Sequence, residues 1–241
     1  MSWAGSEVAQ VYLGRQTAGV VDPLATASAG TVWMAGDSVE DCWRRAIESL
    51  VPKKWRKRRI DLVLSGALAR PFMMAPVAGL RSWREAEQVA ASLAPDATGL
   101  MGPCEVWLGD WSPNRPSLVV AIDIGVRQLI EATARELGVR LAGLRPWWAT
   151  ALRQASQQTP ATRLLAAEDT DALTVLTGEN EGFGSATTYA PCPHPDQIGA
   201  LFARLGLASG VEPDRAVRAT LLTSETVEAA APFAAHWGLA A

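Results

Sequence analysis

The sequence predicts a mixed α/β fold built as two lobes. Three observations predict it: short apolar runs separated by turn residues, amphipathic helices between those runs, and a change of pattern near residues 157–161. The 241 residues are 49% hydrophobic, which is enough for a large core. We place the first lobe over residues 1–158, with an inserted strand–helix–strand subdomain, and the second over 159–241, with a C-terminal helix that returns to the first.

Strands are predicted where apolar residues run between turn signals. Residues 11–13 and 18–21 surround the glycine-containing turn Gly14-Arg15-Gln16-Thr17 and predict a hairpin. Residues 179–182 are expected at the tip of another hairpin. The remaining predicted strands are 31–34, 60–64, 72–75, 104–108, 118–122, 139–144, 163–166, 172–177, 185–189 and 216–222.

Helices are predicted where apolar residues recur at helical spacing behind a capping residue. Asp37 with Glu40, and Ser82 with Glu85, form two such capping pairs, each at the start of a helix. A third helix is expected to begin near Pro146, because proline suits the first helical turn. The other predicted helices span about 126–137, 196–205 and 225–235.

The chain contains ten tryptophans. Trp43 and Trp83 fall on the apolar faces of the first two predicted helices, so both are expected in the core. Core packing accounts for most of the ten, and any exposed subset would mark an interface.

Charge and cysteine usage narrow the class of protein. The formal net charge of −3 predicts neither general nucleic-acid binding nor an acidic scavenger. Cys42, Cys104 and Cys192 are too widely spaced for a disulfide framework or a paired-cysteine metal motif, which favours reduced thiols in the cytoplasm. Residues 1–10 carry no secretory signal, and no apolar run approaches the ~20 residues that span a bilayer. We therefore expect a cytoplasmic protein that is recruited to a membrane if it acts there, or a piece of a longer chain.

Asp123 is the strongest candidate for catalytic chemistry. In Ala121-Ile122-Asp123-Ile124-Gly125, an aspartate and a glycine follow an apolar strand, as they do where actin and hexokinase hold phosphate and magnesium. In such a loop the strand turns into a hairpin, whereas here an amphipathic helix follows at once. We therefore interpret Asp123 as a strand-end residue or a helix N-cap.

The hairpin at 14–17 is where that fold would place a phosphate loop. Its first strand ends in Tyr12 and Leu13 rather than in an aspartate, and the chain has no glycine-rich loop ending in Lys-Ser or Lys-Thr. Nucleotide hydrolysis therefore lacks its usual groups. No cofactor is expected, and ATP stays open as an alternative.

Two further motifs favour a structural interpretation. Cys192 and His194 stand two residues apart among prolines, without a second ligand pair, which indicates a surface turn. Ser65 and Ser185 lack the Gly-x-Ser-x-Gly frame of a nucleophile elbow. We therefore predict no catalytic residue and no metal site, and we expect a protein that is not an enzyme.

The most polarised segment is the basic cluster, residues 53–59, in which six of seven residues are basic. Such a cluster can dock an acidic partner or anionic lipid headgroups, with each basic residue adding about 1 kcal/mol near such a membrane. The alternative is a solvated connection between a helix and a strand. The candidate partner-binding residues are Lys53, Lys54, Trp55, Arg56, Lys57, Arg58 and Arg59.

The order of elements resembles a known family. The segments that carry the resemblance are Ile60-Asp61-Leu62-Val63-Leu64-Ser65, Ala69-Arg70-Pro71-Phe72-Met73-Met74-Ala75-Pro76, the helical Trp83-Arg84-Glu85-Ala86-Glu87, and the strand–helix–strand over 118–144. They resemble PilM-like proteins, the actin-like cytoplasmic components of type IV pilus machines. The cytoplasmic part of GspL in type II secretion is similar.

The resemblance implies an actin-like, ribonuclease H-like fold of two lobes, with mixed sheets flanked by helices. It also implies a non-catalytic scaffold on the cytoplasmic face of the inner membrane, which links an assembly ATPase to an inner-membrane partner. Partner capture would use a groove between subdomains or an exposed strand edge.

The phosphate loops leave two alternatives open. By the same resemblance, residues 179–182 would stand at the second phosphate loop, for which their composition is poor. One alternative is an actin-like ATPase or kinase that uses Asp123 with the Gly14 turn. The other is a filament-forming cytoskeletal protein of the same fold.

Overall fold

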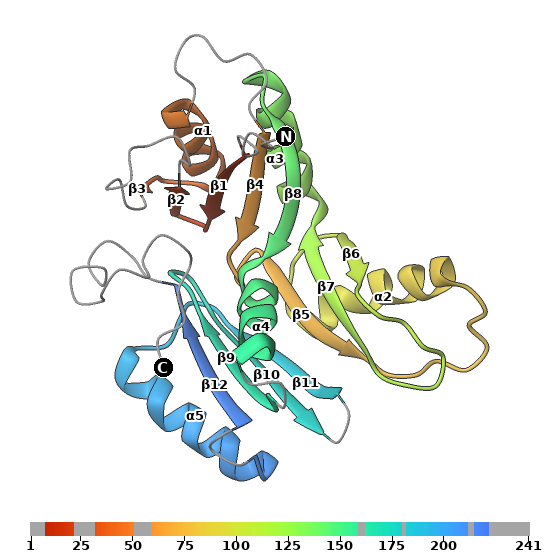
Figure 1. The fold of residues 1–241 in the computed structure, drawn as a ribbon. Coiled ribbons are helices and arrows are strands. Elements are labelled where there is room, and N and C mark those ends of the chain that lie inside the picture. The colour runs from red at the N-terminus through yellow and green to blue at the C-terminus, as the bar shows by residue number, and fades with distance from the viewer. Residues whose placement is uncertain are drawn as a thin grey trace, which may run out of the picture.

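The computed structural model describes residues 8–21, 32–50, 59–158, 162–179, 182–211 and 215–221. In these ranges the strands form three sheets, and helices flank each of them (Figure 1). The fold class is therefore the mixed α/β architecture that the sequence predicts. No helix in these ranges is long and apolar enough to cross a membrane.

The largest sheet has five strands in the order β3–β2–β1–β4–β8. Neighbours among β1, β2 and β3 are antiparallel, whereas β4 runs parallel to both β1 and β8. Helices α1 and α3 pack together against this sheet, and the buried Trp43 donates its indole N–H to the carbonyl of Ile130 at 3.0 Å. The bounds are β1 Val8–Leu13, β2 Thr17–Val21, β3 Val32–Ala35, α1 Val39–Leu50, β4 Arg59–Leu64, α3 Ile124–Glu136 and β8 Arg140–Pro146.

The second sheet is antiparallel and has three strands in the order β5–β7–β6. Helix α2 covers it through three fully buried alanines, Ala86, Ala90 and Ala94. The predicted strand–helix–strand over 118–144 forms, but its two strands belong to different sheets: β7 lies in this sheet and β8 in the five-stranded one. The bounds are β5 Ala69–Met74, α2 Trp83–Thr98, β6 Cys104–Leu108 and β7 Ser117–Asp123.

The third sheet has four strands in the order β11–β10–β9–β12. Alternate residues of β9 face opposite sides: Leu165 packs in the core with α4, and Leu164 packs in the core with α5. The two helices therefore cover opposite faces of this sheet. The bounds are α4 Trp147–Gln158, β9 Leu164–Glu168, β10 Leu173–Glu179, β11 Gly182–Tyr189, α5 Pro195–Ser209 and β12 Ala216–Thr220.

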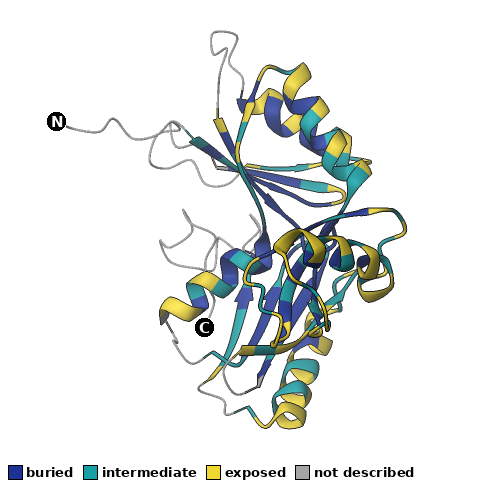
Figure 2. Ribbon diagram, turned by 90° about the vertical axis from the view of Figure 1, so that its right-hand side faces the viewer, coloured by how far each residue is buried: buried dark blue, intermediate teal, exposed yellow. Residues whose placement is uncertain are grey.

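Two local predictions are wrong. Ser38, and not Asp37, caps α1, because its hydroxyl accepts the backbone N–H of Asp41 at 3.1 Å. Trp83 is 42% exposed rather than buried, because α2 turns its alanines toward the sheet. The helices carry both buried and exposed residues, whereas the sheets hold long buried stretches (Figure 2). Trp83 packs edge-on against Trp111, with ring centroids 6.4 Å apart.

Some predictions fall outside the described residues. Six residues of the basic cluster (53–58) and the predicted helix at 225–235 lie there, as does the hairpin tip at 180–181. Arg59, the last residue of the basic cluster, begins β4 and is exposed.

Candidate functional site

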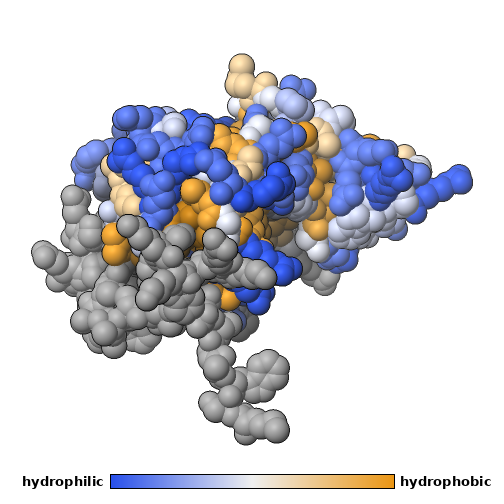
Figure 3. Space-filling view, turned by 90° about the horizontal axis from the view of Figure 1, so that it is seen from above, coloured by the Kyte–Doolittle hydropathy of each residue, from blue (hydrophilic) through white to orange (hydrophobic). Residues whose placement is uncertain are grey.

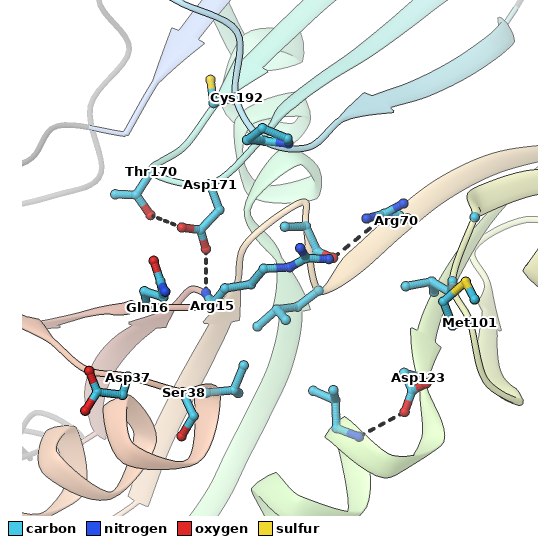
Figure 4. A pocket seen from close by; sticks show the side chains of 17 residues that line it. Arg15, Gln16, Asp37, Ser38, Arg70, Met101, Asp123, Thr170, Asp171 and Cys192 are labelled. Atoms are coloured by element: carbon cyan, nitrogen blue, oxygen red, sulfur yellow. Dashed lines mark hydrogen bonds between the residues drawn. The ribbon is translucent and has the colours of Figure 1, made fainter.

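Three turns from distant parts of the chain meet beside a cavity. They are the β1–β2 turn at 14–16, the β4–β5 turn at 65–68 and the β9–β10 turn at 169–172. The cavity has a volume of about 800 Å³, and the starts of α1 and α3 and the end of α2 also border it (Figure 4). Its size is typical of a ligand cleft.

Asp171 joins the β9–β10 turn to the β1–β2 turn. Its carboxylate accepts the backbone N–H of Arg15 at 2.5 Å. Beside it, the hydroxyl groups of Thr170 and Thr17 share a hydrogen bond of 2.8 Å. Gly14 permits this approach, because a Cβ at that position would collide with the Asp171 carboxylate. A carboxylate of the chain itself therefore lies between the two turns.

Asp169 joins the same turn to the β4–β5 turn. Its buried carboxylate accepts the N–H of Gly66 at 2.8 Å and the hydroxyl of Ser65 at 2.8 Å. It also accepts the hydroxyl of Tyr12 at 3.1 Å and two N–H groups of its own turn at 2.9 Å. Burial raises the pKa of Asp169 to about 6, although the hydrogen bonds from Gly66, Asp171 and Ser65 lower it.

Aspartates also occupy the starts of the two helices at the cavity. Asp123 caps α3: its carboxylate accepts the N–H groups of Gly125 at 2.7 Å and Val126 at 3.2 Å. This confirms the N-cap interpretation of Asp123. At the start of α1, the Asp41 carboxylate accepts the N–H of Asp37 at 3.2 Å. Anions bind helix N-termini through N–H groups of the first turn, so at α3 the chain supplies its own anion, whereas the Asp37 N–H precedes the first residue of α1, Val39.

Comparison with known proteins identifies the fold. No protein-family model matches the chain, and no curated protein matches it. A Bacteroides thetaiotaomicron protein of unknown function with an actin-like ATPase fold has a TM-score of 0.55 at 12% identity, over 95% of this chain and 88% of that one. The chain has the actin-like fold.

Two further solved structures share it. The cytoplasmic domain of EpsL, an inner-membrane component of the type II secretion system of Vibrio cholerae, has a TM-score of 0.52 at 12% identity, over 90% of this chain and 83% of that one. The PilM–PilN type IV pilus biogenesis complex has a TM-score of 0.52 at 11% identity, over 83% of this chain and 65% of that one. The resemblance drawn from the sequence is therefore confirmed at the level of the actin-like fold.

The second phosphate-loop position of the actin-like fold needs correction. The β9–β10 turn at 169–172 contacts the β1–β2 turn, whereas Glu179 is the last residue of β10 and so stands at the other end of that strand. Asp169, Thr170 and Asp171 are site residues that were not predicted from the sequence. The available signal was a short polar turn between two largely apolar strands, which places polar side chains at one edge of a sheet.

The remaining chemical candidates do not assemble into a site. His194 caps α5 from an exposed position, where its Nδ1 accepts the N–H of Asp196 at 3.4 Å, which confirms the surface turn. Cys192 borders the cavity, but burial raises the pKa of its thiol to about 12, which disfavours the thiolate. Over the described ranges, no group of three or more histidine, cysteine, aspartate or glutamate side chains could hold a metal ion.

Two arginines complete the cavity wall. Arg15 extends from the β1–β2 turn into the cavity, and Arg70 approaches from β5 (Figure 4). Arg70 donates to the carbonyls of Thr98 at 2.6 Å and Ala67 at 3.4 Å. Neither guanidinium forms an ion pair with a described residue. The sequence does not indicate this pairing, because Arg15 lies in the β1–β2 turn and Arg70 lies on β5, far apart in the chain.

Proposed function

We propose that this chain is a non-catalytic scaffold of a type IV pilus or type II secretion-like assembly machine, which links an assembly ATPase to an inner-membrane partner. It would act in the cytoplasm at the inner membrane. Two of the solved structures that share its fold come from such machines: the cytoplasmic domain of EpsL from a type II secretion system and the PilM–PilN type IV pilus biogenesis complex.

The observation that carries the proposal is that aspartates of the chain occupy the backbone donors around the cleft. Phosphate groups bind proteins largely through backbone N–H groups of turns and helix starts. Here Asp171 accepts the N–H of Arg15, and Asp169 accepts the N–H of Gly66. Asp123 accepts the N–H groups at the start of α3. A nucleotide would have to displace these carboxylates, which favours a cleft that has lost nucleotide chemistry.

The first experiment measures the melting temperature with and without ATP and magnesium. A ligand at a hundredfold its dissociation constant stabilises the folded state by about 2.7 kcal/mol, so binding would raise the melting temperature visibly. We expect no rise. A rise that Asp123→Ala abolishes would contradict the scaffold proposal and establish the nucleotide-using alternative.

That alternative, an actin-like ATPase or kinase, has one observation in its favour. Asp123 borders the cavity together with the β1–β2 turn, as a metal-holding aspartate would. Only one oxygen of its carboxylate, Oδ1, is engaged with the start of α3. The melting experiment therefore decides between the two functions.

A second experiment tests the partner-binding role of the basic cluster. The six basic residues of 53–59 would be replaced by glutamate, and recovery of inner-membrane and ATPase partners from native membranes would be compared with the unaltered chain. We expect recovery to fall sharply, because each charge contributes about 1 kcal/mol near an anionic surface. Replacement of the exposed Arg81 and Arg84 by glutamate is the control, and equal recovery from both variants would exclude the cluster as the contact.

A further inference from the structure

We propose that Arg15 and Arg70 form a carboxylate-binding site in the interlobe cavity, which receives an acidic segment of a protein partner. The inference rests on the proposed scaffold function, since it names the chemistry of a partner for that same cleft. Arginine suits this role because its planar guanidinium binds a carboxylate through two parallel hydrogen bonds.

The first line of support is the convergence of two positive charges. Figure 4 shows the Arg15 side chain stretched across the cavity toward Arg70. Burial lowers the pKa of the Arg70 guanidinium, and the charge of Arg15 lowers it further. Two cations that repel each other are costly to hold together unless an anion lies between them.

The second line of support is that Arg70 is held in place before any ligand arrives. It donates one N–H group to the carbonyl of Thr98 at the end of α2 and another to the carbonyl of Ala67 in the β4–β5 turn. Gly99 closes α2 in the left-handed conformation, with φ of 69°, and its missing side chain leaves space beside the guanidinium. Three of the five guanidinium N–H groups remain to face a ligand.

The third line of support is the state of the other charges in the cavity. Asp123 and Asp171 already accept backbone N–H groups, and Asp37 lies on the opposite side of the cavity from Arg70 (Figure 4). The charged groups on this wall that can donate hydrogen bonds to a ligand carboxylate are therefore the two guanidinium groups. Leu68 and Leu100 also line the cavity, so the occupant combines carboxylates with apolar side chains, as a protein segment does.

A carboxylate fits this wall better than a phosphate. In the β1–β2 turn, the backbone N–H of Arg15 already donates to the carboxylate of Asp171. Without that donor, phosphate loses the backbone contacts that it normally uses, whereas a carboxylate needs only the guanidinium forks. The turn therefore binds one carboxylate, that of Asp171, and the two arginines beside it would bind a second, that of the partner.

The test uses the full chain and a fluorescein-labelled hexaglutamate peptide, with binding followed by fluorescence polarisation. We expect Arg15→Gln and Arg70→Gln each to weaken binding about tenfold, the cost of one charge-assisted contact. Arg70→Lys keeps the positive charge but cannot form two parallel hydrogen bonds to a carboxylate, so it should weaken binding by less than Arg70→Gln. Arg84→Gln, an exposed arginine on α2, is the matched control and should change nothing.

Three results would overturn the proposal. The first is no binding by the unaltered chain. The second is binding that both glutamine variants leave unchanged, which would put the peptide on other basic residues such as the basic cluster. The third is displacement of the peptide by inorganic phosphate at lower concentration than by glutarate, which would make the site a phosphate site. Failure here leaves the scaffold proposal standing, because that proposal fails only on an Asp123-dependent response to magnesium and ATP.

Discussion

Asp169 accepts hydrogen bonds from three separate parts of the chain. Its carboxylate receives donors from β1 and from the β4–β5 turn, residues that precede it by 157 and 104 positions. Such a group is costly to bury unless every oxygen is hydrogen-bonded, and here both are. Asp169 therefore fixes how the four-stranded sheet meets the five-stranded one. Sequence patterns could not predict this role, because they carry no information about which turns meet in space.

We predict a pH dependence of stability from Asp169. An aspartate in the unfolded chain ionises near pH 4, whereas in the folded protein Asp169 keeps its proton until about pH 6. The folded state binds more protons between these values. The contribution of this group to the free energy of unfolding is therefore full below about pH 4 and falls by about 3 kcal/mol as the pH rises to about 6.

The measurement compares the chain with Asp169→Asn in urea unfolding at pH 4, 5, 6 and 7. The difference in free energy of unfolding should shift in favour of the variant as the pH rises through this window, then become constant. Asp96→Asn, at an exposed position on α2, is the control for general charge effects. A difference that stays constant across all four pH values would contradict the prediction.

At the scale of single elements, the sequence predicted most strands and helices correctly, because alternating and helical apolar patterns follow directly from burial on one face. The misassigned cap of α1 has a local cause: Asp37 and Ser38 are adjacent, both suit an N-cap, and only the backbone path selects Ser38. The prediction that Trp83 is buried was wrong because of how α2 packs in the folded protein. Helix α2 packs closely on a three-stranded sheet through alanines, and a tryptophan on that face would hold the helix away.

The N-cap of α3 gives an element-scale prediction. Asp123→Ala removes the acceptor for the N–H groups of Gly125 and Val126 and should cost about 1 kcal/mol of stability. Asp123→Asn keeps an acceptor and should lose only a few tenths of that amount. Urea unfolding of the three proteins measures this, with Ser82→Ala at the start of α2 as a comparable cap deletion. If the alanine variant is as stable as the parent, the capping contacts of Asp123 are not formed in solution.

At the scale of the whole molecule, one buried cluster joins the sheets. Tyr12 and Val63 of the five-stranded sheet pack with Trp147 and Trp148 of α4 and with Leu165 of β9. Trp148 also donates its indole N–H to the carbonyl of Ala69 at 2.9 Å, which links α4 to β5. Seen from above, the surface shows apolar residues between the polar ones (Figure 3). The sequence predicted two lobes, but it could not predict that α4 carries the contacts that couple them.

Because this cluster is shared, we predict that the described sheets unfold together. Trp147→Ala should cost about 3–5 kcal/mol, since it opens a cavity in the cluster and leaves the carbonyl of Glu168 without the indole N–H at 3.0 Å. Trp83→Ala, at a 42% exposed position, should cost about 1 kcal/mol or less. Thermal unfolding of the parent should give coincident curves by tryptophan fluorescence and far-ultraviolet circular dichroism, and in Trp147→Ala both curves should move down together. Two separate transitions in the parent protein would mean that the lobes fold independently, and the coupling assigned to α4 would then be wrong.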